Sequence, residues 1–298
     1  YALSIALGLL IIARRYTKVN FRHLSLAGML QICRQSLPYA LLILLMGVYM
    51  RSDSLMLERM EGAQQNGLYA ATYRILDIAN MSGFLFAGIL LPLFARLIAR
   101  NMPVQQIVET STHILVSLSL GFVAFSLVYG HDMMNLLYPA DAEQLDLLYK
   151  LTIGSFPAFC IMYIFATLIT AHGKIRLLLK IAGFGSALSI VLNYLLIQQY
   201  HATGAAAASL LVEWILAGIF IVYAIRSSQL KLPVSLPIKL AALFVGMLAL
   251  AMLMARFETT LLTACLLSGC GFLVLVYLLG LWRNDLLRSY PAQFKPNR

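Results

Sequence analysis

The sequence predicts an all-α, polytopic integral membrane protein. Hydrophobic residues make up 61% of the chain, charged residues only 11%, and the mean hydropathy is +0.84. A soluble domain ordinarily carries about 25% charged residues. Apolar runs of about 20 residues, enough for a helix to cross ~30 Å of hydrocarbon, recur along the whole chain. These observations indicate a protein that works within the bilayer.

The apolar runs predict about eight full transmembrane helices and one truncated helix. The full helices are expected at residues 37–57, 67–97, 111–135, 146–171, 177–199, 204–225, 237–256 and 261–282. Residues 1–13 are apolar and are followed by Arg14 and Arg15, as at the end of a helix whose start is missing. This stretch shows no positively charged region followed by a cleavage site, so it is not expected to be a signal peptide. Residues 14–36 are more polar, which indicates a cytoplasmic or interfacial linker.

The basic residues lie in alternate connections between the predicted helices. Of the 22 basic residues, about 17 fall in connections that would share one side of the membrane. That side is expected to be cytoplasmic, because cytoplasmic loops are enriched in Lys and Arg. Both ends of the chain are therefore expected in the cytoplasm. The net charge of +10 follows this topology and does not indicate a nucleic-acid surface.

The sequence carries no motif of a membrane enzyme. It has no His-Glu-x-x-His, no Gly-x-Ser-x-Gly, no Walker sequence and no clustered Asp pair for Mg²⁺. Its four cysteines show no Cys-x-x-Cys spacing. The predicted loops opposite the cytoplasm are too short for a catalytic domain. We therefore expect no enzyme activity, metal or cofactor, and any transport to be passive or ion-driven.

Two neighbouring predicted helices carry charges inside their apolar runs. Arg51 and Asp53 lie near the end of one, and Arg74 and Asp77 near the start of the next. A charge at the centre of a membrane helix costs roughly 2.5 to 3.5 kcal/mol on insertion scales, so such residues usually face a cavity or a partner. In an antiparallel pair, Arg51 could pair with Asp77, or Arg74 with Asp53. The cluster either locks the helices together or forms an anion-binding or ion-coupling site. A hydrophobic pair would lock them at lower cost, which favours the second interpretation.

Other residues inside the apolar runs also indicate particular roles. Glu213 lies near mid-membrane, where it either forms a protonated structural contact or couples transport to protons or cations. Asn193 is expected to tie two helices together, and the small residues 204–209 to let helix backbones approach closely. Pro92 and Pro157 predict bends, because each removes a backbone donor inside a helix.

Two stretches of sequence carry a family resemblance. The first resembles the start of the second half of polysaccharide exporters, the O-antigen and lipid-linked oligosaccharide flippases of the multidrug/oligosaccharidyl-lipid/polysaccharide superfamily. The second resembles the family's Asn-containing helix and its partner rich in Gly and Ala. The residues that carry the resemblance are Pro38-Tyr39, Arg51-Ser-Asp53-Ser-Leu-Met56-Leu57, Gly67-Leu-Tyr69-Ala70-Ala71-Thr-Tyr73-Arg74, Asn193-Tyr-Leu-Leu-Ile197, Gly204-Ala-Ala and Glu213. The turn of the second stretch departs from the family, since Gln198, Gln199 and His201 stand where Pro and Gly are often found.

The resemblance implies the C-terminal portion of a two-lobe flippase fold. The family has two six-helix lobes related by a pseudo-two-fold axis, often followed by two extra helices. On that plan residues 1–13 resemble the end of the sixth helix, 37–225 the second six-helix lobe, and 226–298 the two extra helices with a cytoplasmic tail. On the same plan the first, N-terminal lobe is expected to be missing from this chain. The lobes are expected to alternate access to a central cationic cavity.

The resemblance also implies a function. The expected activity is the flipping of undecaprenyl-pyrophosphate-linked oligosaccharide across the bacterial inner membrane, for polysaccharide, lipopolysaccharide or O-antigen biosynthesis. Arg51 and Arg74 are the candidate contacts to the substrate head group. Asp53, Asp77 and Glu213 are their charge partners or the sites of H⁺ or Na⁺ coupling. The expected partners are the lipid-linked oligosaccharide, membrane lipids and the missing lobe, with no nucleic acid.

Three alternatives stay open. A lipid II flippase and a cation-coupled multidrug exporter belong to the same superfamily. A drug exporter would be expected to present an acidic cavity to cationic drugs, whereas this candidate site has as many Arg as Asp residues. The third alternative is a membrane protein that does not transport.

Overall fold

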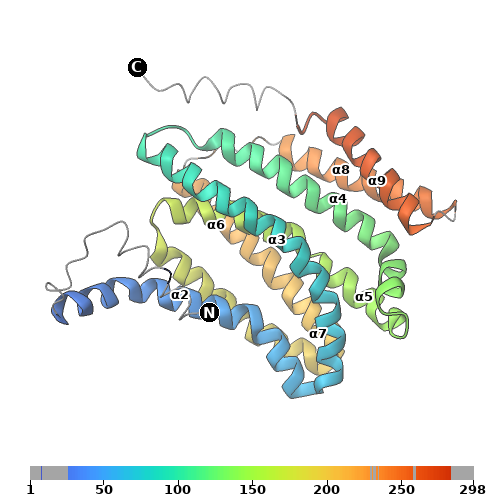
Figure 1. Cartoon of the computed structure of the whole chain (residues 1–298), viewed down its shortest axis with the longest axis horizontal. Helices are drawn as coiled ribbons and strands as arrows, with labels where there is room; N and C mark the ends of the chain where they lie inside the picture. The colour runs from blue at the N-terminus through green and yellow to red at the C-terminus, as the bar shows by residue number, and fades with distance from the viewer. Residues whose placement is uncertain are drawn as a thin grey trace. The chain divides into compact units, whose positions relative to one another are not determined.

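The structure is a computed structural model that describes Gly8, residues 26–228, Leu230, Pro233, and residues 235–257 and 260–282. These described residues are almost entirely helical and contain no strand (Figure 1). The helices are α2 (Leu26–Glu61), α3 (Ala63–Ala99), α4 (Gln105–Leu137), α5 (Ala142–Ile153), α6 (Phe156–Ala171), α7 (Ile175–Ser228), α8 (Ser235–Ala255) and α9 (Leu261–Leu278). The truncated helix predicted at residues 1–13 and the tail after residue 282 lie outside the described residues, apart from Gly8, which is helical.

The chain divides into two units, residues 1–41 and 42–298, with the boundary inside α2. In the first unit α2 is already helical at Leu26, so this helix begins within the segment expected to be a linker. The second unit holds the end of α2 and all the following helices. The predicted division into linker, lobe and extra helices stays a prediction.

The number of membrane-crossing helices agrees with the sequence. Seven helical stretches of the described residues are long and apolar enough to cross a bilayer. One of them, the 54-residue α7, is broken at His201, where φ is 51° and ψ is −130°. It therefore consists of two arms, residues 175–200 and 202–228, and counting them separately gives the predicted eight. The prediction of an all-α polytopic membrane protein is confirmed.

The two arms of α7 run antiparallel and touch. A Cβ atom placed on Gly185 would lie 2.8 Å from Leu216 Cδ1, and one placed on Gly204 would lie 2.1 Å from the carbonyl oxygen of Leu196. Contacts that pair rising residue numbers on one arm with falling numbers on the other define an antiparallel pair. At position 204 the neighbouring atom is backbone, so only glycine fits. The expected close approach at the small residues 204–209 is therefore present.

The two prolines act differently in the structure. Pro92 lies inside α3, as expected. Pro157 instead lies in the first turn of α6, after α5 has ended at Ile153. The first turn of a helix tolerates proline because the missing N–H would have had no intrahelical partner there. A break between two helices thus replaces the bend predicted at Pro157.

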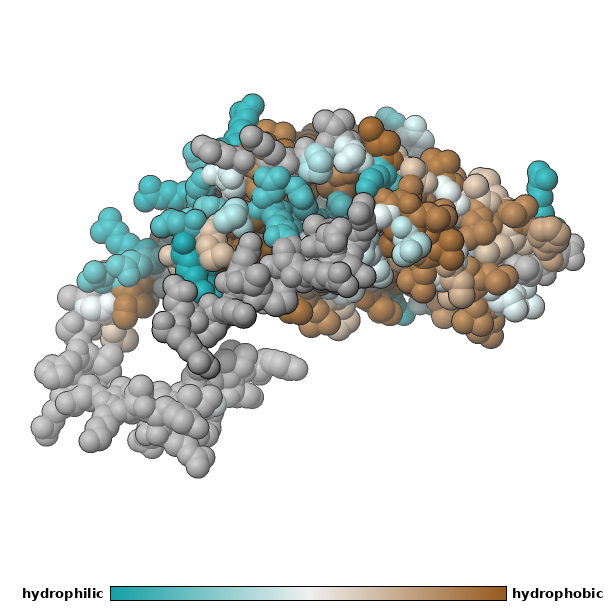
Figure 2. All heavy atoms as spheres, turned by 90° about the horizontal axis from the view of Figure 1, so that it is seen from above, coloured by the Kyte–Doolittle hydropathy of each residue, from teal (hydrophilic) through white to brown (hydrophobic). Residues whose placement is uncertain are grey.

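The core of the second unit is formed by helices that pack along one another. Helix α3 packs on α5, α6 and α7, while α4 packs on α5, α6, α8 and α9. Phe94, Tyr149 and Phe165 are among its largest fully buried side chains. Large apolar side chains are also exposed along α3, α8 and α9, and Figure 2 shows wide apolar areas on the face in view. In a bilayer such surfaces contact lipid.

Candidate functional site

The hairpin between α2 and α3 positions the predicted charged residues. It turns at Gly62, whose φ of 88° favours glycine. Beside the turn, Ser54 Oγ donates a hydrogen bond to Asn66 Oδ1 at 2.7 Å, and Asn66 Nδ2 donates to Glu58 Oε2 at 3.3 Å. These bonds join the end of α2 to the start of α3. The structure therefore brings the two charged stretches side by side, as the sequence predicted.

Three of the four predicted charges lie on the exposed side of this hairpin. Arg51, Arg74 and Asp77 are exposed. The charge of Arg51 acts on the Asp77 carboxylate across the hairpin, although these two side chains form no ion pair. Arg74 Nη1 donates a hydrogen bond to Tyr138 Oη at 3.3 Å, which ties it to the end of α4.

Asp53 lies on the opposite, buried side. Its carboxylate accepts three hydrogen bonds. The donors are the Tyr69 hydroxyl, Ser209 Oγ at 3.2 Å and the backbone N–H of Ser54 at 2.8 Å. The pairing of Arg74 with Asp53 that the sequence allowed is therefore not formed. The reason is geometric, because Arg74 and Asp53 face opposite sides of the hairpin while Tyr69 faces inward with Asp53.

A second set of hydroxyl and amide groups joins α2 to the first arm of α7. Ser52 Oγ lies 3.2 Å from Ser189 Oγ, and Asn193 Nδ2 donates to the same Ser189 oxygen at 3.1 Å. All three residues are buried. Asn193, for which the sequence predicted a tie between helices, is bonded here within its own helix, and Ser189 makes the bond to α2. The amide oxygen of Asn193 has no hydrogen-bond partner among the described residues.

Glu213 is buried in the second arm of α7, and only 4% of its surface is exposed. The Tyr49 hydroxyl of α2 lies next to its carboxyl group, but Glu213 Oε2 has no hydrogen-bond partner among the described residues. No described Lys, Arg or His forms an ion pair with Glu213 or Asp53. A buried polar atom without a partner is costly, so an unpaired carboxylate oxygen here is suited to holding a proton or a cation.

The exposed and the buried groups of this site differ in what they can bind. Guanidinium groups on the exposed face can contact an anion such as a phosphate. The buried groups offer oxygen atoms, which protons and hard cations prefer. Across the described part of the chain, no three His, Cys, Asp or Glu side chains come together as a metal site.

Sequence reasoning missed several members of the buried group. Tyr49, Tyr69, Ser189 and Ser209 are polar but uncharged, so they do not stand out in an apolar run. Helical spacing offered a signal for two of them. Ser189 stands four residues before Asn193, and Ser209 four residues before Glu213, so each shares a helix face with a residue that the sequence had singled out.

Comparisons with known proteins agree with the family resemblance found in the sequence. Residues 1–98 match the family model described as "Polysaccharide biosynthesis protein". No curated protein matches the sequence. Among solved structures the chain resembles "Lipid II flippase MurJ, inward closed conformation", with a TM-score of 0.71, 12% sequence identity, and coverage of 91% of this chain and 57% of that chain.

The structural likeness concerns the fold, and the chain spans just over half the length of that solved flippase. The family match covers the hairpin with Arg51 and Arg74, and the fold match covers most of the rest. Residues 1–98, about a third of the chain, thus match the kind of family that the sequence resemblance predicted, and the fold resembles that of the solved flippase.

Proposed function

We propose that this chain forms the second lobe of a flippase that moves undecaprenyl-pyrophosphate-linked oligosaccharide across the bacterial inner membrane. The observation that carries the proposal is the separation of charge on the α2–α3 hairpin. Arg51 and Arg74 lie on its exposed side, and Asp53 is bonded on its buried side. Exposed arginines at membrane depth need a partner, and a pyrophosphate head group is one that guanidinium groups bind well.

The proposed site needs a facing lobe. The chain covers 57% of the solved flippase, which supports a longer two-lobed protein. In that protein the exposed side of the hairpin would face the first lobe and line a central cavity. Asp77 would then balance the charge of Arg51 when the substrate is absent.

We propose the buried carboxylates as the coupling site. Glu213 Oε2 and Asn193 Oδ1 are both buried without hydrogen-bond partners among the described residues, and Asp53 lies on the same side of α2 as the serine tie to α7. Binding of H⁺ or Na⁺ there would change how α2 is held against α7. Because α2 also carries Arg51, this change would reach the substrate side.

The same proposal sets the orientation. With both ends of the chain in the cytoplasm, the α2–α3 turn and the break at His201 would lie on the periplasmic side. The distribution of basic residues supports this placement. The product would serve polysaccharide, lipopolysaccharide or O-antigen assembly.

The test reconstitutes the two-lobed protein in proteoliposomes with fluorescent undecaprenyl-pyrophosphate oligosaccharide, and measures access of a membrane-impermeant quencher to the head group. Arg51→Ala and Arg74→Ala should each lower the flipping rate at least tenfold, while Arg256→Ala, an exposed arginine between α8 and α9, should leave it unchanged. Retention of wild-type rates in the Arg51 and Arg74 variants would overturn the cationic site.

A second candidate is a lipid II flippase, which the resemblance to the solved lipid II flippase favours. The same assay with fluorescent lipid II distinguishes the two substrates. Faster flipping of lipid II than of the oligosaccharide would assign the chain to that function instead. Export of a cationic drug in place of both lipids would favour the multidrug alternative.

A further inference from the structure

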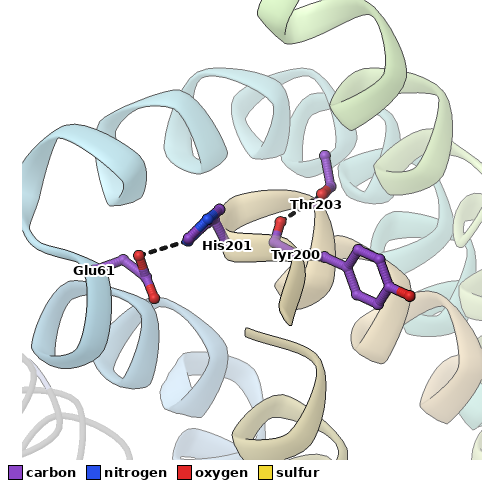
Figure 3. Close-up of polar contacts among 4 residues, drawn as sticks. All are labelled: Glu61, Tyr200, His201 and Thr203. Carbon is purple, nitrogen blue, oxygen red and sulfur yellow. Dashed lines mark hydrogen bonds and ion pairs between the residues drawn. The ribbon is translucent and has the colours of Figure 1, made fainter. Parts of the chain in front are cut away.

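The tip of the α2–α3 hairpin contacts the break in α7 through a carboxylate and an imidazole. His201 Nδ1 lies 2.6 Å from Glu61 Oε2, as Figure 3 shows. Glu61 is the last residue of α2, and His201 lies between the two arms of α7. The His201 side chain is 60% exposed and that of Glu61 22%, so water reaches the pair.

The backbone conformation of His201 is unusual for a residue other than glycine. A φ of 51° with a ψ of −130° lies in a region that glycine adopts readily and other residues rarely adopt. Near the break, the backbone of Gly204 lies against the Leu196 carbonyl group, where a Cβ atom would have no room. A histidine that occupies a glycine conformation and contacts a carboxylate suggests that the imidazole itself has a role.

We propose that the Glu61–His201 pair is a positioning contact that holds the α2–α3 hairpin against α7 most firmly when His201 is protonated. This inference rests on the proposed function, since it makes periplasmic pH set the position of Arg51 and Arg74. An imidazolium donates a stronger, charge-assisted hydrogen bond to a carboxylate than a neutral imidazole does. Histidine is the side chain whose charge ordinarily changes between about pH 5 and 8.

The neighbouring charges allow this control. On α2 the other charged groups near the tip are Glu58, whose carboxylate accepts from Asn66, and Arg59, which is exposed. The first turn of α3 carries no acidic residue. On α7 the titratable neighbour is Tyr200, and Figure 3 shows its ring directed away from the imidazole. Glu61 is thus the acceptor that faces His201.

The contact differs from the other ties between the hairpin and α7. The Ser52–Ser189 bond is buried and joins two neutral hydroxyl groups, whereas the partly buried Asp53–Ser209 bond joins a hydroxyl donor to a carboxylate. The Asp53 carboxylate is only 4% exposed, in contrast to the water-exposed imidazole of His201. Protonation of His201 can therefore tighten or release the tip while the buried ties keep the two elements together.

The first experiment measures distances rather than transport. Spin labels are placed on the exposed residues Gln64 and Gln198 of the two-lobed protein in nanodiscs, and the distance distribution is recorded from pH 5 to pH 8.5. In the protein without further substitutions, the ratio of the short-distance to the long-distance population should fall about two- to fivefold as pH rises. This range is the one expected for the loss of a partly exposed ion pair. Glu61→Gln and His201→Gly should each abolish this response. Glycine suits the backbone at position 201, so the second variant should fold.

The controls separate the pair from other titrations. Glu58→Gln should keep the pH response, and His201→Lys should show a short distance at every pH, because its charge is permanent over this range. A pH response that persists in Glu61→Gln or His201→Gly would overturn the proposal. Flipping is then measured on the same variants. A distance response without flipping of either lipid would refute the proposed function and leave the pH-controlled contact standing.

Discussion

The Tyr69 hydroxyl donates a hydrogen bond to the Asp53 carboxylate across the α2–α3 hairpin, with both residues almost fully buried. Ser209 of α7 donates to the same carboxylate. One acidic side chain therefore connects three helical segments from inside the protein. Removal of a donor leaves a buried acceptor less well satisfied, which is costlier than the loss of an exposed bond.

Tyr69→Phe is expected to destabilise the protein by about 1–2 kcal/mol, because the phenyl ring fills the same space but cannot donate to Asp53. The measurement is the thermal unfolding midpoint in detergent. Tyr277→Phe is the matched control, since Tyr277 is 84% exposed, and its midpoint should not change. Equal midpoints for both variants would show that the Tyr69–Asp53 bond contributes nothing to stability.

Gly204→Ala should be strongly destabilising. A Cβ atom there would lie 2.1 Å from the Leu196 carbonyl oxygen, so the arms of α7 would have to separate. Overpacking of this kind typically costs about 1–3 kcal/mol, occasionally more. Gly218→Ala in the same arm is the control, because nothing lies within 4 Å of a Cβ built there. The two variants should differ in thermal midpoint and in yield after detergent extraction, and a stable Gly204→Ala protein would contradict the antiparallel contact.

His201→Gly is expected to stabilise the protein by about 1 kcal/mol at alkaline pH, where the contact to Glu61 is weakest. Glycine adopts this backbone conformation without the strain of roughly 1–3 kcal/mol that it imposes on another residue. The gain should shrink as pH falls, since the original protein then recovers a protonated pair. Unfolding midpoints of both proteins from pH 5 to 8.5 check this, and an unchanged or lower midpoint at pH 8.5 would show that position 201 is not strained.

Glu213→Gln should leave the protein folded and uncouple it from an ion gradient. The amide keeps the shape of the carboxyl group but cannot carry its charge or its exchangeable proton. In proteoliposomes the stimulation of flipping by an imposed H⁺ or Na⁺ gradient should fall at least tenfold. Glu143→Gln, at an exposed position of α5, should keep that stimulation. Full stimulation in the Glu213 variant would assign Glu213 a structural role.

The chain alone is expected not to flip lipids. Its exposed arginines would have no facing lobe, so no closed cavity could form around a head group. Vesicles with the isolated chain should match protein-free vesicles in quencher access. Flipping by the isolated chain would overturn the two-lobe assignment.

The helices themselves could be predicted from the sequence. Membrane helices satisfy their backbone hydrogen bonds internally, so a long apolar run is nearly sufficient to specify one. The break in α7 was also visible, because Gln198, Gln199 and His201 interrupt two apolar runs. Helix ends were less predictable. Helix α2 begins at Leu26 rather than at residue 37, since helices continue past the apolar run into more polar sequence.

Only part of the site could be predicted from the sequence, as Arg51 and Asp53 illustrate. Their charges inside an apolar run showed that this stretch is special, because charge in hydrocarbon is expensive wherever it occurs. Which of the two faces inward depended on the packing of α2 against α7. Ser209 follows Asp53 by 156 residues, and no local pattern specifies a contact over that separation. Composition and periodicity thus determine membrane helices, whereas their packing determines the partner of each polar group.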